Sequence, residues 1–80
     1  MEIKQTGRFR KVYKKLHANQ LKDVNNALSE VIKNPAIGEQ RKGNLSWLRV
    51  NKFKVINQLA LLGYSFDETG GTTFIKTLLS

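Results

Sequence analysis

Lys52 and Lys54 are the two residues of this chain whose type and spacing most directly suggest chemistry. Alternate residues of a β-strand point to the same face, so a strand at this position would present two ammonium groups side by side. Ammonium groups can neutralise a phosphate during its reaction, and a lysine can act as a base. The competing interpretation is a solvated strand face. By the same alternation, Arg49 is predicted to lie on the opposite face, where it would bind RNA or pair with a carboxylate.

Basic residues are concentrated around these lysines rather than spread along the chain. The 80 residues include 14 Lys and Arg and 6 Asp and Glu, which gives a formal net charge of +8. Five basic residues and no acidic residue fall within positions 41–54, and six basic residues against one acidic residue fall within positions 1–15. Such clusters attract polyanions, so we expect a nucleic acid or a nucleoprotein as the partner.

Four further basic residues in these clusters are candidates for nucleic-acid binding. Arg41 and Lys42 lie in a loop that contains glycine, and Lys14 and Lys15 lie on the predicted solvent face of a helix. Exposed basic side chains of this kind commonly bind backbone phosphates. An ordinary exposed loop and an ordinary helix surface are the competing interpretations for the two pairs.

Several other classes of site are excluded by composition. The chain has no cysteine, which excludes disulfides, thiolate ligands and thiol nucleophiles. The chain has a single histidine, His17, and this count excludes a two-histidine ribonuclease mechanism. His17 itself is expected to be a cap or a surface residue between two helices. The acidic residues are scattered, so no metal site is predicted. With no glycine-rich phosphate motif, membrane span or signal peptide visible, we expect a cytoplasmic protein that uses no membrane, metal or small-molecule cofactor.

Hydrophobic periodicity predicts two helices after a short first strand. Residues 1–5 alternate between apolar and polar types, and Thr6 is a suitable cap for the helix that follows. One apolar stripe at helical spacing extends over residues 9–16, and a second extends over residues 21–32. Asn19 is the predicted N-cap of the second helix, and an Asn-Pro pair ends it because the residue before proline disfavours the helical conformation.

Three strands are predicted after the helices. They cover residues 45–55, 59–66 and 72–79, with a reversal at 56–58 and a turn at 67–71 between them. The second of these strands is nearly continuously apolar, which predicts a central strand buried on both faces. The order β-α-α-β-β-β predicts one α+β domain over residues 1–80, in which a two-helix hairpin packs on a small twisted antiparallel sheet.

The large side chains of these strands can be assigned to the core or to the surface. Trp47 would be able to stack on a nucleobase, but it is expected to anchor the core. Tyr64, at the end of the apolar strand, is expected in the core, with its hydroxyl bonded to a partner at the rim. In the last strand, alternation places Lys76 on the same side as Phe74 and Leu78.

Several runs of the sequence carry a resemblance to a known family. They are YKKLHANQ at residues 13–20, NPAIGEQ at 34–40, KGNL at 42–45, LRVNKFK at 48–54 and NQLALLGY at 57–64. With these runs the chain resembles the RelE/ParE family of toxins from bacterial type II toxin–antitoxin modules. The resemblance implies the fold described above and neutralisation by a cognate acidic antitoxin. If the chain is of the RelE branch, the resemblance implies cleavage of mRNA in the ribosomal A site. If it is of the ParE branch, the resemblance implies inhibition of DNA gyrase without nuclease chemistry.

The resemblance also implies roles for individual residues. Lys52 and Lys54 match a Lys-x-Lys pair that acts on the scissile phosphate and as base, and Tyr64 matches a tyrosine of the third strand. Leu61 stands where the family has an arginine, and Lys76 is the only basic residue after Tyr64, so the usual general acid has no counterpart. Three functions therefore stay open: ribosome-dependent mRNA cleavage, inhibition of DNA gyrase, and a shortened, inactive toxin that only binds its antitoxin.

Overall fold

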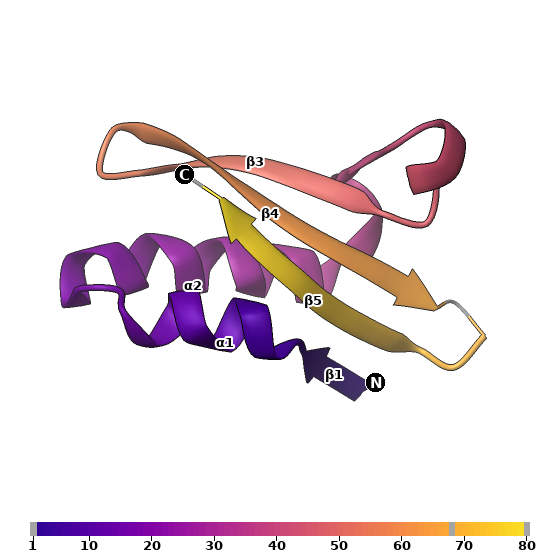
Figure 1. Ribbon diagram of the computed structural model, residues 1–80, viewed down its shortest axis with the longest axis horizontal. Helices are drawn as coiled ribbons and strands as arrows, with labels where there is room; N and C mark the ends of the chain where they lie inside the picture. The colour runs from indigo at the N-terminus through magenta and orange to yellow at the C-terminus, as the bar shows by residue number, and fades with distance from the viewer. Residues whose placement is uncertain (1, 68, 80) are drawn as a thin grey trace.

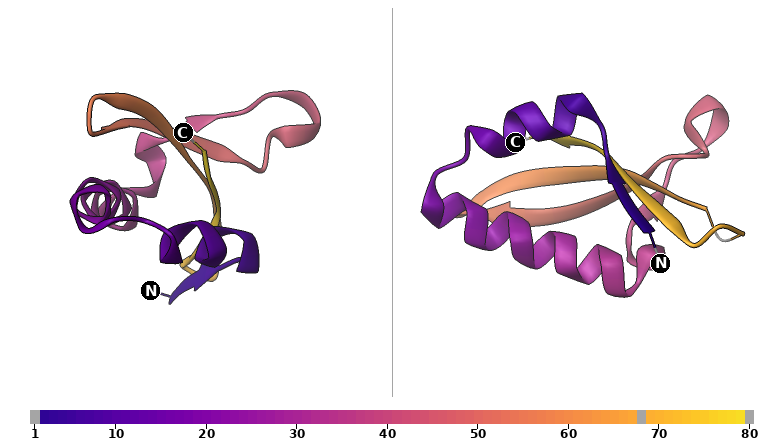
Figure 2. Two further views of the ribbon diagram at one scale, coloured as in Figure 1. Left: turned by 60° about the vertical axis from the view of Figure 1, so that its left-hand side comes forward. Right: turned by 90° about the horizontal axis from the view of Figure 1, so that it is seen from below.

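The computed structural model describes residues 2–67 and 69–79, in which two helices cover one face of a five-stranded sheet (Figure 1). The helices are α1 (Gly7–Lys14) and α2 (Ala18–Lys33), with two short 3-10 helices, η1 (Pro35–Ile37) and η2 (Gly43–Leu45). The strands are β1 (Glu2–Gln5), β2 (Glu39–Gln40), β3 (Arg49–Val55), β4 (Gln58–Asp67) and β5 (Thr72–Leu79). Seen from below in Figure 2, both helices lie in front of the sheet. The α+β fold and its two-helix layer are thus confirmed.

The sheet has the order β1-β5-β4-β3-β2 and is mixed rather than fully antiparallel. β1 pairs with β5 in parallel, whereas the other neighbouring strands are antiparallel. The chain leaves β1 through Thr6, whose N–H donates to the carbonyl of Ile75 at 3.0 Å, and enters α1 directly. The last strand then returns beside the first one. The predicted antiparallel arrangement was wrong for this pair, because the sequence of a short edge strand does not indicate its partner.

Caps define the beginnings of the two helices. The hydroxyl oxygen of Thr6 accepts a hydrogen bond from Phe9 N–H at 3.1 Å, as predicted. The N-cap of α2 is His17 rather than Asn19, so that prediction was wrong. The backbone N–H of His17 donates to Oε1 of Gln20 at 2.9 Å, which is the reach-back bond of a capping box. The expectation that His17 is a cap is confirmed.

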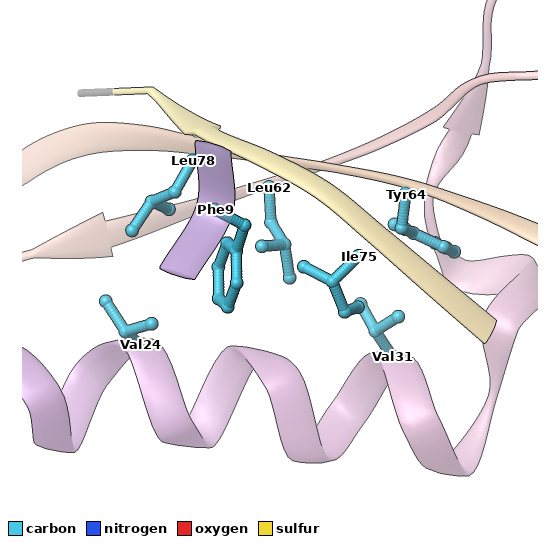
Figure 3. Close-up of a cluster of buried hydrophobic side chains, with 7 residues drawn as sticks. All are labelled: Phe9, Val24, Val31, Leu62, Tyr64, Ile75 and Leu78. Carbon is cyan, nitrogen blue, oxygen red and sulfur yellow. The ribbon is translucent and has the colours of Figure 1, made fainter. Parts of the chain in front are cut away.

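The core lies between the helices and one face of the sheet. Seven buried side chains form it, from α1, α2, β4 and β5 (Figure 3): Phe9, Val24, Val31, Leu62, Tyr64, Ile75 and Leu78. β4 is central, as predicted, but it is not buried on both faces. Its side chains alternate, so that Leu62 and Tyr64 face the helices while Leu59 is 59% exposed. The second face of the sheet, which we call the open face, is covered by neither α1 nor α2.

The segment before β3 differs from the predicted strand 45–55. η2 begins at Gly43, which has a φ of +68°, and Ser46 N–H donates to the Gly43 carbonyl at 3.1 Å. This turn delays the strand to Arg49 and leaves Trp47 on the surface, 55% exposed. The assignment of Trp47 to the core was therefore wrong. The predicted loop also contains the two residues of β2, which pair with the start of β3.

A two-residue turn joins β3 to β4. Val55 pairs with Gln58, and the residues between them, Ile56 and Asn57, have φ values of 49° and 66°. Positive φ at both central residues is the pattern of a type I′ hairpin turn. The N–H of Ile56 donates to Oδ2 of Asp23 in α2 at 3.0 Å, which ties the turn to the helix layer.

A β-bulge interrupts the pairing of β4 with β5. Gly63 pairs with Thr77 and Tyr64 pairs with Ile75, so Lys76 is an extra residue in β5. A bulge shifts the alternation of side chains by one position. Ile75 and Leu78 are consequently both in the core, and the prediction that Lys76 and Leu78 share a side was wrong.

Candidate nucleic-acid interface on the open face

Lys52 and Lys54 lie together on the open face. In the β3–β4 pairing, Lys52 is opposite Leu61 and Lys54 is opposite Leu59. Residues that pair directly share a face, and these leucines alternate with the core residues of β4. Both lysine side chains are exposed. The predicted common face of the two lysines is confirmed, and their ammonium groups are available to an anion.

A groove of about 310 Å³ lies beside the lysines on the same face. Its floor is Gly63, which pairs with Val50 on one side and Thr77 on the other. A Cβ at Gly63 would lie 2.9 Å from Cγ2 of Thr77, so the missing side chain keeps this space open. Seven residues line the groove: Arg41, Leu48, Val50, Leu61, Gly63, Thr77 and Leu79.

Arg41 brings a further positive charge to the rim of this groove. Its backbone N–H donates to the carbonyl of Leu48 at 2.9 Å, which fixes the loop beside the start of β3. Lys42, the next residue, is exposed and is the N-cap of η2. The structure therefore brings Arg41, Lys52 and Lys54 to one face, with Lys42 adjacent to Arg41.

The other predicted nucleic-acid-binding residues do not join this group. Arg49 faces the helix side, as alternation predicted, and its Nη1 donates to the carbonyl of Gly38 at 3.1 Å. Lys14 and Lys15 lie exposed at the C-terminal end of α1, in the helix layer. A ligand on the open face would not contact these three side chains.

Tyr64 lies in the core, and its hydroxyl is committed to the loop after α2. The hydroxyl donates to the carbonyl of Pro35 and accepts from Gly38 N–H, the latter at 2.9 Å. Burial raises the pKa of Tyr64 above its ordinary value, while the bond from Gly38 and the charge of Arg49 act in the opposite direction. The predicted core position with a bonded hydroxyl is confirmed, and Tyr64 supplies no acid or base to the open face.

Sequence reasoning missed a second group on the open face. Nζ of Lys76 lies 4.0 Å from the ring centroid of Phe74 and 5.8 Å from that of Trp47. Phe74 and Lys76 are two positions apart in a strand, which was a usable signal. Trp47 could not be added to them, because the turn that exposes it was not predicted.

The described ranges, residues 2–67 and 69–79, contain neither a metal-binding cluster nor a membrane-spanning helix. No group of three or more His, Cys, Asp or Glu side chains is placed to hold a metal ion. No helix in this part of the chain has the length and apolar character needed to cross a membrane.

Comparison with known proteins gives one family and several similar structures. A family model described as the ParE-like toxin of type II bacterial toxin–antitoxin systems matches residues 3–79. No curated protein matches the chain.

Three solved structures from E. coli are similar to it in fold, although their sequence identities are low. The intact RelBE toxin–antitoxin complex has 18% identity, covers 99% of this chain and 94% of that chain, and gives a TM-score of 0.78. The isolated RelE toxin has 18% identity, coverage of 99% and 82%, and a TM-score of 0.77. A RelE mutant in complex with the antitoxin peptide RelBc has 16% identity, coverage of 99% and 81%, and a TM-score of 0.74.

Proposed function

The chain belongs to the ParE-like toxins of type II bacterial toxin–antitoxin systems, and from this we propose that it inhibits translation by cleaving mRNA on the ribosome in the cytoplasm. The observation that carries the proposal is that Lys52, Lys54 and Arg41 share the open face, where Arg41 lines the groove and Lys52 pairs with Leu61 of its wall. A line of cations beside a groove suits the backbone of a single RNA strand. The fold of RelE, which this chain shares, supports the same choice.

Cleavage of RNA by its own 2′-hydroxyl needs a base, neutralisation of the phosphate and protonation of the leaving oxygen. The chain's one histidine and two tyrosines lie in or beneath the helix layer among the described residues, away from the open face. We assign neutralisation of the scissile phosphate to the ammonium group of one of Lys52 and Lys54, while the amine lone pair of the other takes the proton of the 2′-hydroxyl. The 2′-oxygen then displaces the 5′-oxygen at phosphorus, and solvent protonates the departing 5′-oxygen. Arg41 binds a neighbouring phosphate at the rim of the groove. In this arrangement, electrostatic stabilisation of the phosphate is the main contribution.

An acidic antitoxin is the expected protein partner. The RelBE structure is a complex of a toxin with its antitoxin, and the present chain has the same fold. Its net charge of +8 is complementary to an acidic peptide. We propose that such a partner neutralises the toxin by covering the cationic open face.

Mapping of mRNA ends during cell-free translation tests the proposal. The purified chain is added to translating ribosomes, and cut sites are located by primer extension. We expect the Lys52→Ala/Lys54→Ala variant to lose at least about 100-fold in cleavage rate, as when a transition-state contact is removed. Lys22→Ala/Lys33→Ala is the matched control, because these lysines are also exposed but lie on α2. Equal cleavage by the two double variants would remove Lys52 and Lys54 from the site.

Binding to DNA gyrase, without chemistry, is a second candidate function. The exposed leucines 59 and 79 on the open face favour it, because apolar side chains beside a groove are typical of protein contacts. A supercoiling assay with purified gyrase discriminates between the two functions. Inhibition at micromolar concentrations, with no cut sites on mRNA, would replace the first proposal by the second. Normal growth after induced expression would favour the third function, a toxin that only binds its antitoxin.

A further inference from the structure

An exposed tryptophan, a phenylalanine and a lysine meet at one end of the open face. Trp47 is 55% exposed, although large aromatic side chains are usually buried in small domains. The ammonium group of Lys76 lies 4.0 Å from the ring centroid of Phe74 and 5.8 Å from that of Trp47, both within the range of cation–π attraction. The indole is therefore held by a charged neighbour, while more than half of its surface faces solvent.

Lys76 reaches this position because of the bulge in β5. The extra residue turns the side chains of both Lys76 and Thr77 to the open face, while Ile75 and Leu78 on either side of them point into the core. The hydroxyl of Thr6 donates to the carbonyl of Lys76 at 2.6 Å and so satisfies a carbonyl of the bulge. A backbone feature, anchored from the helix layer, thus sets where the ammonium group lies.

The cluster lies across β4 from the two lysines of β3, and the groove is lined by residues of all three strands. Phe74 pairs with Ser65 in β4, whereas Lys52 pairs with Leu61. The two partners in β4, Ser65 and Leu61, are four residues apart, which corresponds to roughly 13 Å along the strand. The floor of the groove, Gly63, lies between them. A single strand that follows the groove from Lys52 therefore arrives at the aromatic cluster.

An unpaired nucleobase matches this surface chemically. Bases stack on exposed aromatic rings in single-stranded recognition, and an ammonium group beside the ring can donate to the acceptors on the base edge. The surrounding charge suits the backbone of the same strand, since residues 41–54 include five basic residues and no acidic one. Both parts of a nucleotide would thus find a partner on one face.

We propose that Trp47, Phe74 and Lys76 form a stacking platform that binds one unpaired base of a single-stranded RNA whose backbone lies in the groove. The proposal rests on the proposed action on RNA and adds to it a second contact with the substrate strand. Trp47 provides the stacking surface. Phe74 and Lys76 fix the orientation of the indole, and Lys76 contacts the edge of the base.

Trp47 is the only tryptophan of the chain, so its fluorescence reports on the platform directly. A fluorescein-labelled single-stranded RNA of nine nucleotides is titrated at low salt, and binding is followed by anisotropy. A matched unlabelled RNA is titrated to follow tryptophan fluorescence. We expect the quenching of Trp47 to saturate over the same concentration range as binding. A strand of the same length without bases is expected to bind but not to quench.

Variants separate stacking from charge. We expect Trp47→Ala to weaken binding of the normal RNA about 10-fold and to leave binding of the abasic strand within 2-fold, because stacking contributes for each base that stacks. Trp47→Phe is expected to recover most of the affinity. Lys76→Gln is compared with Lys33→Gln, which removes the same charge from the exposed surface of α2. We expect only the first of these to reduce the quenching.

The outcomes distinguish this proposal from the proposed function. RNA binding without quenching, together with unchanged affinity of Trp47→Ala, would overturn the platform and leave mRNA cleavage standing. Quenching by RNA in a chain that cuts no mRNA would support the platform and overturn the cleavage. Absence of RNA binding at low salt would overturn the platform. Quenching by an acidic antitoxin peptide but not by RNA would also overturn it and make the cluster a protein interface.

Discussion

The hydroxyl of Tyr64 connects the centre of the sheet to the loop that follows α2. It is bonded to Pro35 and Gly38, and Arg49 reaches the carbonyl of the same glycine. A Cβ at Gly38 would overlap the hydroxyl oxygen of Tyr64, so only glycine fits against the ring. These contacts hold the loop in place. β2 follows this loop directly, and Arg41 at the rim of the groove comes next in the chain. In this chain Arg49 and Tyr64 stabilise this loop on the side of the sheet that faces the helices.

The stability of the protein at high pH should depend on Tyr64. Burial disfavours the phenolate and raises the pKa of this group from its ordinary value of 10.0. A pKa raised on folding stabilises the protein below pH 10.0, and this contribution is lost as the pH rises through the folded-state pKa. We expect the midpoint of thermal unfolding to fall more steeply above pH 10.0 in the wild type than in Tyr64→Phe. If the unfolding midpoints of the two proteins fell equally with pH above pH 10.0, this prediction would be wrong.

Thr73 is a buried residue whose hydroxyl has no hydrogen-bond partner among the described residues. A buried unsatisfied polar group destabilises a fold, so Thr73→Val, which preserves the shape, is expected to increase the free energy of unfolding by about 1 kcal/mol. Urea denaturation measures the change. Thr72→Val, at a half-buried position of the same strand, is the control and should change stability less. A loss of stability in Thr73→Val would reveal a partner for the hydroxyl.

At the scale of elements, the turn between β3 and β4 contains an unfavourable residue. Ile56 has a φ of 49°, a conformation that costs a β-branched residue about 1–2 kcal/mol, yet its side chain is 48% exposed. Replacement of Ile56-Asn57 by Asn-Gly, the preferred pair of a type I′ turn, should raise the free energy of unfolding by about 1 kcal/mol. Denaturant unfolding of Ile56→Asn/Asn57→Gly tests this. Ile37→Asn, an exposed isoleucine outside the turn, should bring no such gain.

Thr6 joins three elements, since it caps α1 and bonds to the bulge of β5 directly after β1. Thr6→Ala removes both side-chain bonds, and we expect a loss of about 2 kcal/mol in the free energy of unfolding. Thr6→Ser keeps the hydroxyl and should recover most of it. Because the bulge positions Lys76, the alanine variant should also show an altered fluorescence spectrum of Trp47 in the folded state. An unchanged spectrum would mean that the bulge forms without this bond.

The elements that the sequence predicted are those determined by local patterns. Helix and strand order follow from apolar periodicity, and the common face of Lys52 and Lys54 follows from alternation along one strand. The parallel pairing of β1, the bulge at Lys76 and the groove over Gly63 depend on register between distant segments. No window of sequence contains that information. Trp47 was misplaced for a different reason, because a local 3-10 turn that begins at Gly43 moved it out of the predicted strand.

For the molecule as a whole, charge should govern the affinity for RNA. Contacts with two phosphates, the scissile one at Lys52 and Lys54 and a neighbouring one at Arg41, predict a slope of about −1.4 in a plot of log binding constant against log salt, at about −0.7 per phosphate for a single strand. The Lys52→Ala/Lys54→Ala variant should lower the magnitude of this slope by about 0.7. Anisotropy titrations at several salt concentrations measure both. Equal slopes for wild type and variant would place the RNA elsewhere.

The parallel pairing of β1 with β5 joins segments 70 residues apart, and Thr6 fastens that junction through Ile75 and Lys76. Contacts between such distant segments form late in folding, because a large loop must close before they can be made. A chain still emerging from the ribosome lacks β5, and with it Phe74, Lys76 and one wall of the groove. The complete open face therefore arises only after β5 has left the exit tunnel.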